Sequence, residues 1–335
     1  MAKVAINGMG RIGRAALKII QDTPELDLVA VNDLMAIDNL IYLLRYDTVY
    51  GRYDKPVSAE GGVLHVGTRE IKFLSEKDPT KLPWKDLGID IVFECTGVFT
   101  SREGLEKHLQ AGAGNVILSA PSKGEGDVPM VVHCVNTPED ACQVISCASC
   151  TTNCTAPVME VLERHLGIQK ALMTTIHAYT SSQAIVDGPA KKFRRGRAGA
   201  ANFVPTSTGA AIAVTKTLPQ LKGKFDGLAV RGPVPVGSLV DIVLLVKRPT
   251  TVDEINQIFR EESESPRYKG VLGYAYDEIV SSDVIGETRA SVFDPTGTLV
   301  VDGDLIKVMS WYDNEWSYTC QMVREAVRIS KGKIS

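Results

Sequence analysis

A single cysteine among hydroxyl residues is the most reactive candidate side chain of this sequence. Cys150 lies in the run Ser149-Cys150-Thr151-Thr152-Asn153-Cys154, and His177 follows 27 residues later on an apolar, strand-like stretch. Only the thiolate form of cysteine attacks a carbonyl carbon well, and an ordinary thiol, with a pKa of about 8.5, is mostly protonated at neutral pH. A nearby histidine or a helix N-terminus favours the thiolate. The pattern therefore indicates a nucleophilic cysteine, with a buried, inert cysteine as the alternative.

The residues after Cys150 predict a helix. Ser149 is a residue type that caps helix N-termini, and apolar side chains with helical spacing continue to about residue 165. Pro157 is expected to kink or delay this helix, because proline lacks the backbone N–H of a helix interior.

Two other kinds of chemistry are open to the cysteines around Cys150. Cys147 and Cys150 form a C-x-x-C pair, but a structural zinc site usually needs a second pair or spaced histidines, which the sequence lacks. A dithiol redox pair belongs near the start of a short βαβ domain, whereas this pair lies in the middle of the chain. The spacing therefore disfavours both alternatives, and we expect no metal.

A glycine-rich turn near the N-terminus predicts a dinucleotide site. A short apolar strand over 4–7 runs into the motif Gly8-Met9-Gly10-Arg11-Ile12-Gly13-Arg14 and then into an apolar helical pattern over 15–20. In this fingerprint the first glycine permits a tight turn, the second lets the backbone approach a pyrophosphate, and the third allows the helix and the strand to pack closely. The order of strand, turn and helix is the context that the fingerprint requires.

An acidic residue follows the second strand of the same pattern. The strand over 28–32 ends at Asp33, 20 residues after Gly13, where a carboxylate can accept hydrogen bonds from the ribose hydroxyls. Because it would repel a 2′-phosphate, NAD is favoured over NADP, although dual use stays open. Strand-like runs over 89–95 and 115–119 continue the pattern. Residues just past parallel strands line the ligand crevice, which adds four expected cofactor contacts: Thr96, Gly97, Phe99 and Ser119.

Length and hydrophobic patterning predict two domains. The chain has 335 residues, of which 44% are hydrophobic, so it can bury a large core. After residue 150, alternating runs predict a mostly antiparallel sheet; these runs cover 170–177, 225–231, 239–246 and 298–310. We expect an α/β fold, with an N-terminal Rossmann-like dinucleotide-binding domain over 1–149 and an α+β catalytic domain over 150–314. A last helix over 315–335 is expected to pack back on the first domain.

Composition also narrows the compartment and the partners. Seven cysteines without a disulfide-like spacing indicate a reducing compartment. The sequence has no signal peptide and no long apolar run, so we expect a cytoplasmic protein that does not bind a membrane. A net charge of −3 gives no general reason to expect nucleic-acid binding. The one basic run, over 191–197, is a solvated loop face, an anion site or a subunit contact.

Taken together, these motifs resemble phosphorylating glyceraldehyde-3-phosphate dehydrogenases along essentially the whole chain. The resemblance rests on the glycine motif over 7–14, Asn32-Asp33, the cysteine motif over 148–154, His177-Ala178-Tyr179-Thr180, the stretch over 204–211 and the stretch over 311–316. It implies a homotetramer that oxidises D-glyceraldehyde 3-phosphate with NAD and inorganic phosphate, giving 1,3-bisphosphoglycerate in glycolysis.

The resemblance also assigns roles to residues. Cys150 would attack the aldehyde to form a thiohemiacetal, hydride would leave to the nicotinamide, and phosphate would cleave the resulting thioester. His177 would hold the thiolate, take the hydroxyl proton and stabilise the oxyanion. The attacking phosphate would be bound by Ser149, Thr151, Thr208 and Gly209, and the substrate phosphate by Thr180 and Arg231, with Arg195 nearby. The implied NAD contacts are Arg11, Ile12, Asp33, Ser119, Asn314 and, beside the adenine, Lys77.

Three positions depart from the family pattern. Ser182 stands where a carboxylate commonly supports the substrate-phosphate arginine, Val236 replaces an asparagine near the active site, and Gly188 replaces a leucine or alanine at a position that influences NAD/NADP choice. These changes keep erythrose-4-phosphate dehydrogenase, a hydrolytic relative, as an alternative function. A second alternative, of another class, is a secondary role in binding nucleic acid or a regulatory partner through the dinucleotide groove and the basic run.

Overall fold

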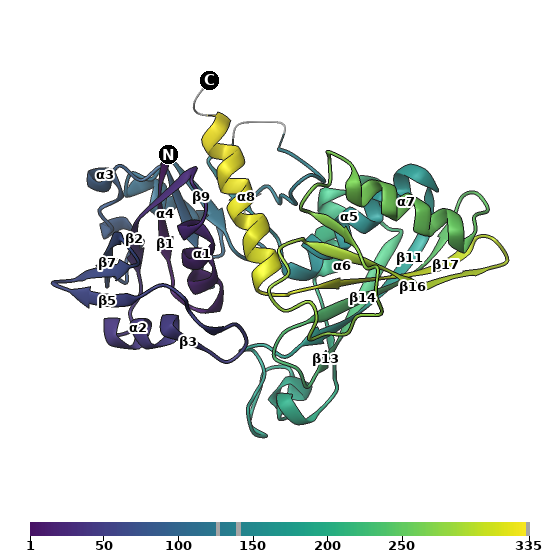
Figure 1. The fold of residues 1–335 in the computed structure, drawn as a ribbon, viewed down its shortest axis with the longest axis horizontal. Helices are drawn as coiled ribbons and strands as arrows, with labels where there is room; N and C mark the ends of the chain where they lie inside the picture. Colours follow the sequence, from purple (N-terminus) through teal and green to yellow (C-terminus); the bar gives the residue numbers. More distant parts are fainter. Residues whose placement is uncertain (125–127, 139–141, 333–335) are drawn as a thin grey trace. The chain divides into compact units, whose positions relative to one another are not determined.

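The computed structural model describes residues 1–124, 128–138 and 142–332 and is shown in Figure 1. The chain divides into two compact units. The first unit consists of Met1–Val131, Pro138–Ala148 and Met322–Ser335, and the second of Val132–Thr137 and Ser149–Gln321. In the described part of the chain, no helix is both long enough and apolar enough to span a bilayer.

An eight-stranded sheet forms the centre of the first unit, in the order β10-β9-β8-β1-β2-β7-β6-β5. The strands from β10 to β7 are parallel, and β6 and β5 extend the sheet antiparallel. Their bounds are β1 (Ala2–Asn7), β2 (Leu26–Asn32), β5 (Val57–Glu60), β6 (Val63–Val66), β7 (Arg69–Leu74), β8 (Ile91–Glu94), β9 (Asn115–Leu118) and β10 (Val144–Ser146), with a separate hairpin of β3 (Tyr46–Asp47) and β4 (Gly51–Arg52). The order reverses direction at β1, so the carboxyl ends of β1 and β8 form the topological switch point of a Rossmann-type sheet. The predicted fold class is confirmed.

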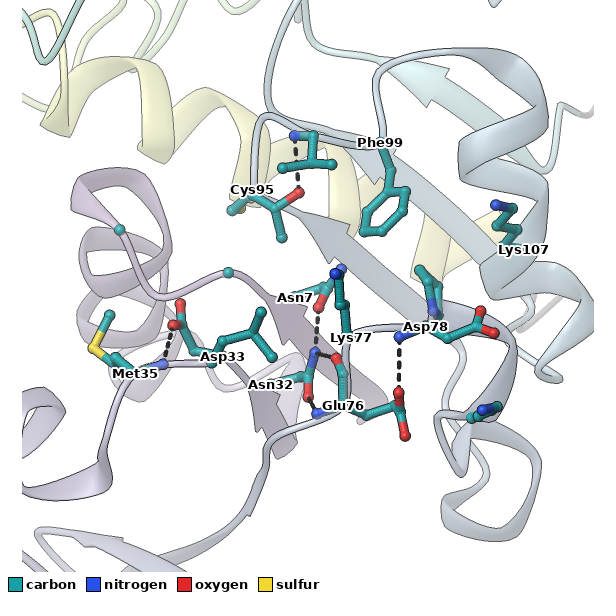
Figure 2. A pocket seen from close by; sticks show the side chains of 17 residues that line it. Asn7, Asn32, Asp33, Met35, Glu76, Lys77, Asp78, Cys95, Phe99 and Lys107 are labelled. Atoms are coloured by element: carbon teal, nitrogen blue, oxygen red, sulfur yellow. Dashed lines mark hydrogen bonds between the residues drawn. The ribbon is translucent and has the colours of Figure 1, made fainter.

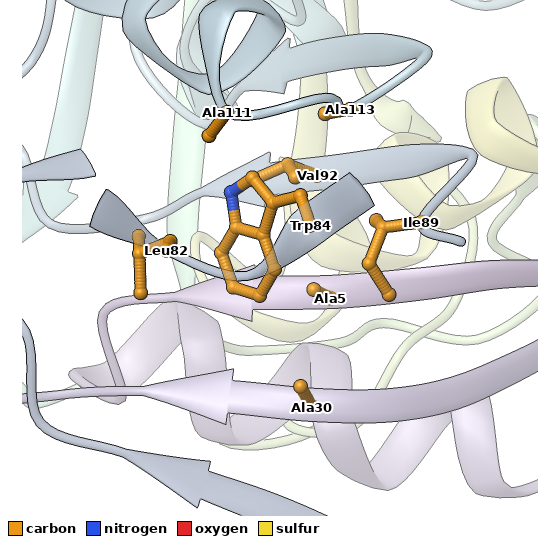
Figure 3. Close-up of a cluster of buried hydrophobic side chains, with 8 residues drawn as sticks. All are labelled: Ala5, Ala30, Leu82, Trp84, Ile89, Val92, Ala111 and Ala113. Carbon is orange, nitrogen blue, oxygen red and sulfur yellow. The ribbon is translucent and has the colours of Figure 1, made fainter. Parts of the chain in front are cut away.

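The first unit also contains four complete helices among its described residues. They are α1 (Arg11–Gln21), α2 (Ile37–Arg45), α3 (Trp84–Leu87) and α4 (Arg102–Gln110), with the 3₁₀ turn η1 (Pro79–Lys81). Helix α1 packs on β1 and β2, and α4 packs on β9 and β10. Figure 3 shows Trp84 of α3 lying over three strand positions, Ala5, Ala30 and Val92. The small alanine side chains leave room for the indole against the sheet.

A seven-stranded sheet forms the centre of the second unit, in the order β12-β13-β11-β14-β17-β16-β15. Its strands are β11 (Ile168–Ala178), β12 (Val204–Ser207), β13 (Phe225–Gly232), β14 (Ser238–Val246), β15 (Leu272–Tyr274), β16 (Ser291–Val301) and β17 (Leu305–Tyr312). Only the β11–β13 and β15–β16 neighbours run parallel, so the prediction of a mostly antiparallel sheet is confirmed.

Helices of the second unit pack on this sheet: α5 (Cys150–His165), α6 (Ala210–Thr217) and α7 (Val252–Glu264). The unit also contains the start of α8 (Trp316–Gly332) and the 3₁₀ turns η2 (Phe193–Gly196), η3 (Gly199–Ala201) and η4 (Pro219–Leu221). Helix α5 lies against β11, β14, β16 and β17, while α6 lies against β13 and α7 against β15 and β16. The first residues of α8 belong to the second unit and the rest to the first. Residues 333–335 of the expected last helix lie outside the described residues.

Two predictions about single elements were wrong. The run over 298–310 is not one strand, because Asp302 and Gly303 adopt positive φ angles of 50° and 80° and turn the chain from β16 into β17. The alternation of apolar and polar residues continues on both sides of this short turn, so the sequence pattern does not reveal it. Pro157 does not delay its helix, since α5 begins at Cys150 and continues through the proline. The side chains from 151 to 162 are all buried, and this packing outweighs the one missing N–H.

Candidate active site

Cys150 occupies the first turn of α5 in the second unit. Ser149 caps the helix, because its hydroxyl oxygen accepts a hydrogen bond from the backbone N–H of Thr152 at 3.2 Å. The unpaired N–H groups of a helix start carry partial positive charge, which favours an anion such as a thiolate. The backbone N–H groups of Cys150 and Thr151 lie in hydrogen-bond contact with the thiol.

The structure brings His177 to Cys150. Nε2 of His177 lies 3.3 Å from Sγ of Cys150, and the imidazole is only 4% exposed. His177 is the tenth residue of β11 and pairs with Arg231 across β13, so the sheet register fixes the imidazole beside the guanidinium. Burial, and then the charge of Arg231, lower the pKa of His177 to about 3. The imidazole is therefore neutral at neutral pH.

Arg231 and Ala178 both contact Nδ1 of His177. Nη1 of Arg231 lies 2.6 Å from Nδ1 and 2.9 Å from the carbonyl oxygen of Ala178, and that oxygen lies 2.7 Å from Nδ1. The guanidinium can only donate and favours Nδ1 as an acceptor, whereas the carbonyl oxygen can only accept and favours a proton on Nδ1. In the tautomer that Arg231 favours, the ring proton is on Nε2 and His177 presents an N–H to the sulfur of Cys150.

The thiol of Cys150 is protonated in this arrangement. Burial raises its pKa above the ordinary value, while the charge of Arg231 and the hydrogen bonds from the helix start act in the opposite direction. The side chain is partly accessible, so a substrate can reach it. A substrate that enters the site therefore finds the Cys150 thiol and the His177 imidazole neutral and not as an ion pair.

Tyr312 is a site residue that the sequence did not reveal. Its hydroxyl lies 2.9 Å from Oγ1 of Thr151 and 2.9 Å from Oγ1 of Thr175, and its ring meets His177 edge-on with centroids 5.9 Å apart. Burial raises the pKa of Tyr312 well above its usual value, so its hydroxyl stays protonated. Tyr312 lies in the stretch over 311–316 that carried the resemblance, but at the end of an alternating strand it reads as ordinary core.

The residues expected to bind phosphate differ in what their side chains contact. Arg195 donates to Oγ1 of Thr206 at 3.0 Å, and its charge helps to lower the pKa of His177, so it lies close to the pair. Thr180 pairs with Ser182 through their hydroxyls at 2.9 Å. Nε of Arg231 is buried without a hydrogen-bond partner among the described residues, which leaves one donor of the guanidinium for an anion.

A second group of expected phosphate ligands lies at helix starts. Oγ1 of Thr208 accepts from the backbone N–H of Ala210 at 3.2 Å at the start of α6, and the space beside Gly209 is open. The hydroxyl of Thr151 is instead buried and contacts the hydroxyl of Tyr312. Among the departures from the family, Val236 is buried and Gly188 is exposed.

A pocket of about 830 Å³ lies in the first unit, at the carboxyl ends of β1, β2 and β8 (Figure 2). Six residues predicted to bind the cofactor line it: Gly8, Gly10, Asp33, Lys77, Thr96 and Phe99. Other lining residues were not predicted to bind the cofactor; they include Asn7, Asn32, Met35, Glu76 and Cys95. Most of them lie at the carboxyl end of a strand or just after it, which is the signal that could have identified them.

Other predicted cofactor residues do not line this pocket. Arg11 forms an ion pair with Asp47 at the start of α1, and Ile12 is the second residue of that helix. Ser119 donates its backbone N–H to the carbonyl oxygen of Glu94 at 3.0 Å, and Gly97 takes a positive φ of 70° in the loop after β8. Asn314 belongs to the second unit, where its Oδ1 accepts from Ser238 at 3.0 Å.

The glycines of the N-terminal turn make a cradle for a pyrophosphate. A Cβ on Gly8 would lie 2.6 Å from the backbone nitrogen of Thr96, and one on Gly13 would lie 1.9 Å from the carbonyl oxygen of Gly8. These two glycines let the turn, the helix and the loop after β8 pack in contact. The space beside Gly10 is open, and no side chain caps the start of α1. The start of a helix favours an anion such as a phosphate.

Two backbone N–H groups hold the carboxylate of Asp33, which can still accept further hydrogen bonds. One carboxylate oxygen accepts from the backbone N–H of Met9 at 2.6 Å and the other from the N–H of Met35 at 2.8 Å. Each oxygen retains a further acceptor site, which suits a ribose with two free hydroxyls. Pocket, cradle and carboxylate therefore fit a dinucleotide such as NAD.

The remaining cysteines near Cys150 are buried. Burial raises the pKa of Cys154 to about 12 and that of Cys147 well above its usual value. Within the described residues, no three or more histidine, cysteine or acidic side chains lie in a group that could hold a metal ion.

Two models of one protein family match the chain. The family model "Glyceraldehyde 3-phosphate dehydrogenase, NAD binding domain" matches residues 2–102, and "Glyceraldehyde 3-phosphate dehydrogenase, C-terminal domain" matches residues 149–314.

Curated relatives match over nearly the whole chain. Glyceraldehyde-3-phosphate dehydrogenase of Clostridium pasteurianum is 49% identical over 331 residues, covering 97% of each chain. The enzyme of the same name from Geobacillus stearothermophilus is 47% identical over 98% of this chain and 99% of its own. That of Thermotoga maritima is 49% identical over 96% of this chain and 97% of its own. With its dinucleotide pocket and its cysteine–histidine pair, this chain belongs to the glyceraldehyde 3-phosphate dehydrogenase family.

Proposed function

We propose that this NAD-dependent oxidoreductase converts D-glyceraldehyde 3-phosphate and inorganic phosphate into 1,3-bisphosphoglycerate, as a step of glycolysis. The family and its NAD-binding domain give the cofactor and the class of reaction. The observation that carries the proposal further is the 3.3 Å contact between Cys150 and His177 at the start of α5. We assign NAD binding to residues 1–149 and catalysis to residues 150–314.

In this mechanism Sγ of Cys150 forms a bond to the aldehyde carbon while the π bond of the carbonyl breaks, and the thiol proton passes to the carbonyl oxygen. Nε2–H of His177 donates a hydrogen bond to that oxygen as negative charge develops there, and the product is a thiohemiacetal. NAD, when bound, would supply the acceptor for the hydride of the same carbon. Loss of the hydride and of the hydroxyl proton leaves a thioester. An oxygen of inorganic phosphate then attacks the carbonyl carbon, and the C–S bond breaks to release the acyl phosphate and the cysteine thiolate.

Arg231 links substrate binding to the proton state of His177. A substrate phosphate that engages the guanidinium would draw Nη1 away from Nδ1. The ring proton could then sit on Nδ1 and point at the carbonyl oxygen of Ala178, 2.7 Å away. Nε2 would be free to accept the hydroxyl proton of the thiohemiacetal, so one histidine can serve as donor and then as base.

Two anion sites follow from the residues around this pair. Arg231 and Arg195, with Thr180, supply charge and hydroxyl donors for the substrate phosphate. Ser149, Thr208 and Gly209 lie at the starts of α5 and α6, where backbone N–H groups suit the attacking phosphate.

The test is formation of reduced cofactor, followed by absorbance, with glyceraldehyde 3-phosphate in the presence and absence of inorganic phosphate. Sustained turnover with NAD that requires phosphate supports the proposal. Turnover that does not need phosphate, or that needs erythrose 4-phosphate, would contradict it and favour the hydrolytic relative. In that case Ser182 and Val236 would be the first residues to exchange.

We also propose that the protein is a homotetramer. The face of the second unit's sheet away from its helices exposes several apolar side chains beside the Asp241–Lys307 ion pair; these include Leu172, Leu228, Val243, Leu299 and Leu305. Exposed apolar faces of this kind usually mark interfaces. Light scattering after size exclusion measures the mass directly, and Leu172→Asp is expected to yield smaller species. A monomeric mass for the unaltered chain would contradict the assignment.

All seven cysteines are free in the structure, which supports our proposal that the protein works in the reducing cytoplasm. Fractionation of the source cells, with detection of the protein in the cytoplasmic fraction, tests this location.

A further inference from the structure

A buried carboxylate lies beneath the dinucleotide pocket of the first unit. Glu94, the last residue of β8, is 0% exposed, and both of its oxygens are fully used. Oε2 accepts from Nδ2 of Asn7 at 2.6 Å and lies 3.0 Å from Nε2 of His108. Oε1 accepts from the backbone N–H of Thr96 at 2.8 Å and from the Thr96 hydroxyl. A carboxylate offers about four acceptor positions, and four donors occupy them here.

Trp84 fixes the direction of the bonds at one end of this group. Nε1 of Trp84 donates to Nδ1 of His108 at 3.0 Å. An indole N–H can only donate, so Nδ1 accepts, and the ring proton of His108 lies on Nε2 and points at Glu94. Trp84 itself is held in the cluster of Figure 3. The histidine therefore cannot turn its acceptor nitrogen to the carboxylate.

Backbone groups fix the direction at the other end. Oδ1 of Asn32 accepts from the backbone N–H of Glu76 at 2.8 Å, and Nδ2 of Asn32 donates to the carbonyl oxygen of Glu76 at 2.9 Å. The same Nδ2 donates to Oδ1 of Asn7 at 2.7 Å, which leaves Nδ2 of Asn7 to donate to Glu94. Figure 2 shows the links from Asn7 through Asn32 to Glu76. If the side-chain amide of Asn7 or Asn32 exchanged its oxygen and nitrogen, a donor would face a donor or an acceptor would face an acceptor.

The network joins the loops that form the dinucleotide pocket. Asn7 and Asn32 end β1 and β2, and Glu76 follows β7, while Thr96 follows β8. All four residues line the pocket. The ring of His108 also meets the ring of Phe99, another lining residue, edge-on with centroids 6.4 Å apart. The hydrogen bonds around Glu94 thus link the ends of β1, β2, β7 and β8, next to the close contact between Gly8 and Thr96.

We propose that Glu94 is a positioning residue for NAD: its ionised carboxylate, with His108 as its oriented partner, holds the loops after β1, β2, β7 and β8 in the arrangement that binds the dinucleotide. Glu94 contacts no ligand itself. Its influence passes through Thr96, Asn7 and the ring of Phe99. The proposal rests on the NAD binding of this family and not on the phosphorylating reaction.

Glu94→Gln tests the proposal, because the amide places an N–H₂ group against two donors while keeping the shape of the side chain. We expect the dissociation constant for NAD, measured by titration calorimetry, to rise about tenfold, in line with the loss of a hydrogen bond to a charged group. KM for NAD should rise in parallel, whereas KM for the aldehyde and kcat at saturating NAD should change little. Cofactor binding is read without turnover, so the result does not depend on the reaction proposed above.

The matched control is Glu160→Gln. Glu160 is also buried and hydrogen-bonded, but it lies in the second unit with Arg164 and Tyr268. The Glu160→Gln substitution should lower the melting temperature and leave the dissociation constant for NAD unchanged. An unchanged dissociation constant in Glu94→Gln would overturn the proposal, and so would an equal rise in the control.

A second variant covers the case in which Glu94→Gln does not fold. His108→Phe keeps the ring between Trp84 and Phe99 and removes one donor to the carboxylate. We expect a smaller rise in the dissociation constant, again with kcat preserved. If this variant binds NAD as the unaltered protein does, the positioning role of the network is refuted. Failure of the unaltered protein to bind NAD would instead count against the cofactor assignment.

Discussion

The imidazole of His177 lies 3.3 Å from the sulfur of Cys150, although 27 residues separate them in the chain. Cys150 begins α5, and His177 is the last residue but one of β11. Their contact makes the sulfur the attacking atom and the imidazole its proton partner.

Removing either member of this pair should stop turnover without removing the cofactor. Cys150→Ser replaces the thiol with a hydroxyl that is far harder to ionise, so we expect no measurable NAD reduction. His177→Asn should lower kcat by roughly 10²- to 10⁴-fold, the range for loss of a positioned acid–base group. Both variants should bind NAD normally by calorimetry. Activity that persisted in Cys150→Ser would refute the covalent mechanism.

The charge of Arg231 should control the acid limb of the pH profile. Burial and this guanidinium together lower the pKa of His177 to about 3. Removing the charge in Arg231→Gln lets the imidazole protonate more readily, so its pKa rises and the acid limb of kcat/KM should move to higher pH. Arg231→Lys keeps the charge and should keep the limb near its original position. A limb that stays fixed in both variants would exclude His177 as the titrating group.

Two glycines of the N-terminal turn should respond differently to substitution. Gly8 has a φ of 98° and no room for a Cβ, so Gly8→Ala should destabilise the protein by about 1–3 kcal/mol. Gly10 has a φ of −67° and open space beside it, so Gly10→Val should fold normally but occupy the space of the pyrophosphate. Thermal unfolding and NAD titration of the two variants separate these effects. Normal NAD affinity in Gly10→Val would mean that the phosphates bind elsewhere.

The ion-pair cluster at the end of α5 should stabilise the protein only above acidic pH. Burial alone would raise the pKa of Glu160, but hydrogen bonds from Arg164 and Tyr268 and the charge of Arg267 lower it below the usual 4.5. A carboxyl whose pKa is lowered by folding adds stability that is complete above the unfolded-state pKa and is lost as the pH falls through the folded-state value. The difference in urea midpoint between the unaltered protein and Glu160→Gln should therefore be larger at pH 7 than near pH 3. An equal difference at both pH values would contradict this assignment.

The sequence alone determined the nature of both sites, because their signals are local. Gly8, Gly10 and Gly13 have the spacing that a dinucleotide-binding turn between a strand and a helix requires. The position of Asp33 is set by the lengths of the helix and the strand that come after this turn. Cys150 after a capping serine is likewise a local pattern, since the cap, the helix and the thiol lie within a few residues.

The tertiary structure decided which groups act on one another. Sheet register places Arg231 beside His177, and the hydroxyl of Tyr312 reaches Thr151 across 161 positions. Glu94 reads in the sequence as the polar end of a buried strand, yet its carboxylate meets Asn7 at the end of β1 and His108 of α4, in addition to Thr96 in its own loop. Hydrogen bonds between distant segments depend on packing, and no pattern of neighbouring residues records them. The sequence therefore identifies the reactive residues, and the fold sets their protonation and their geometry.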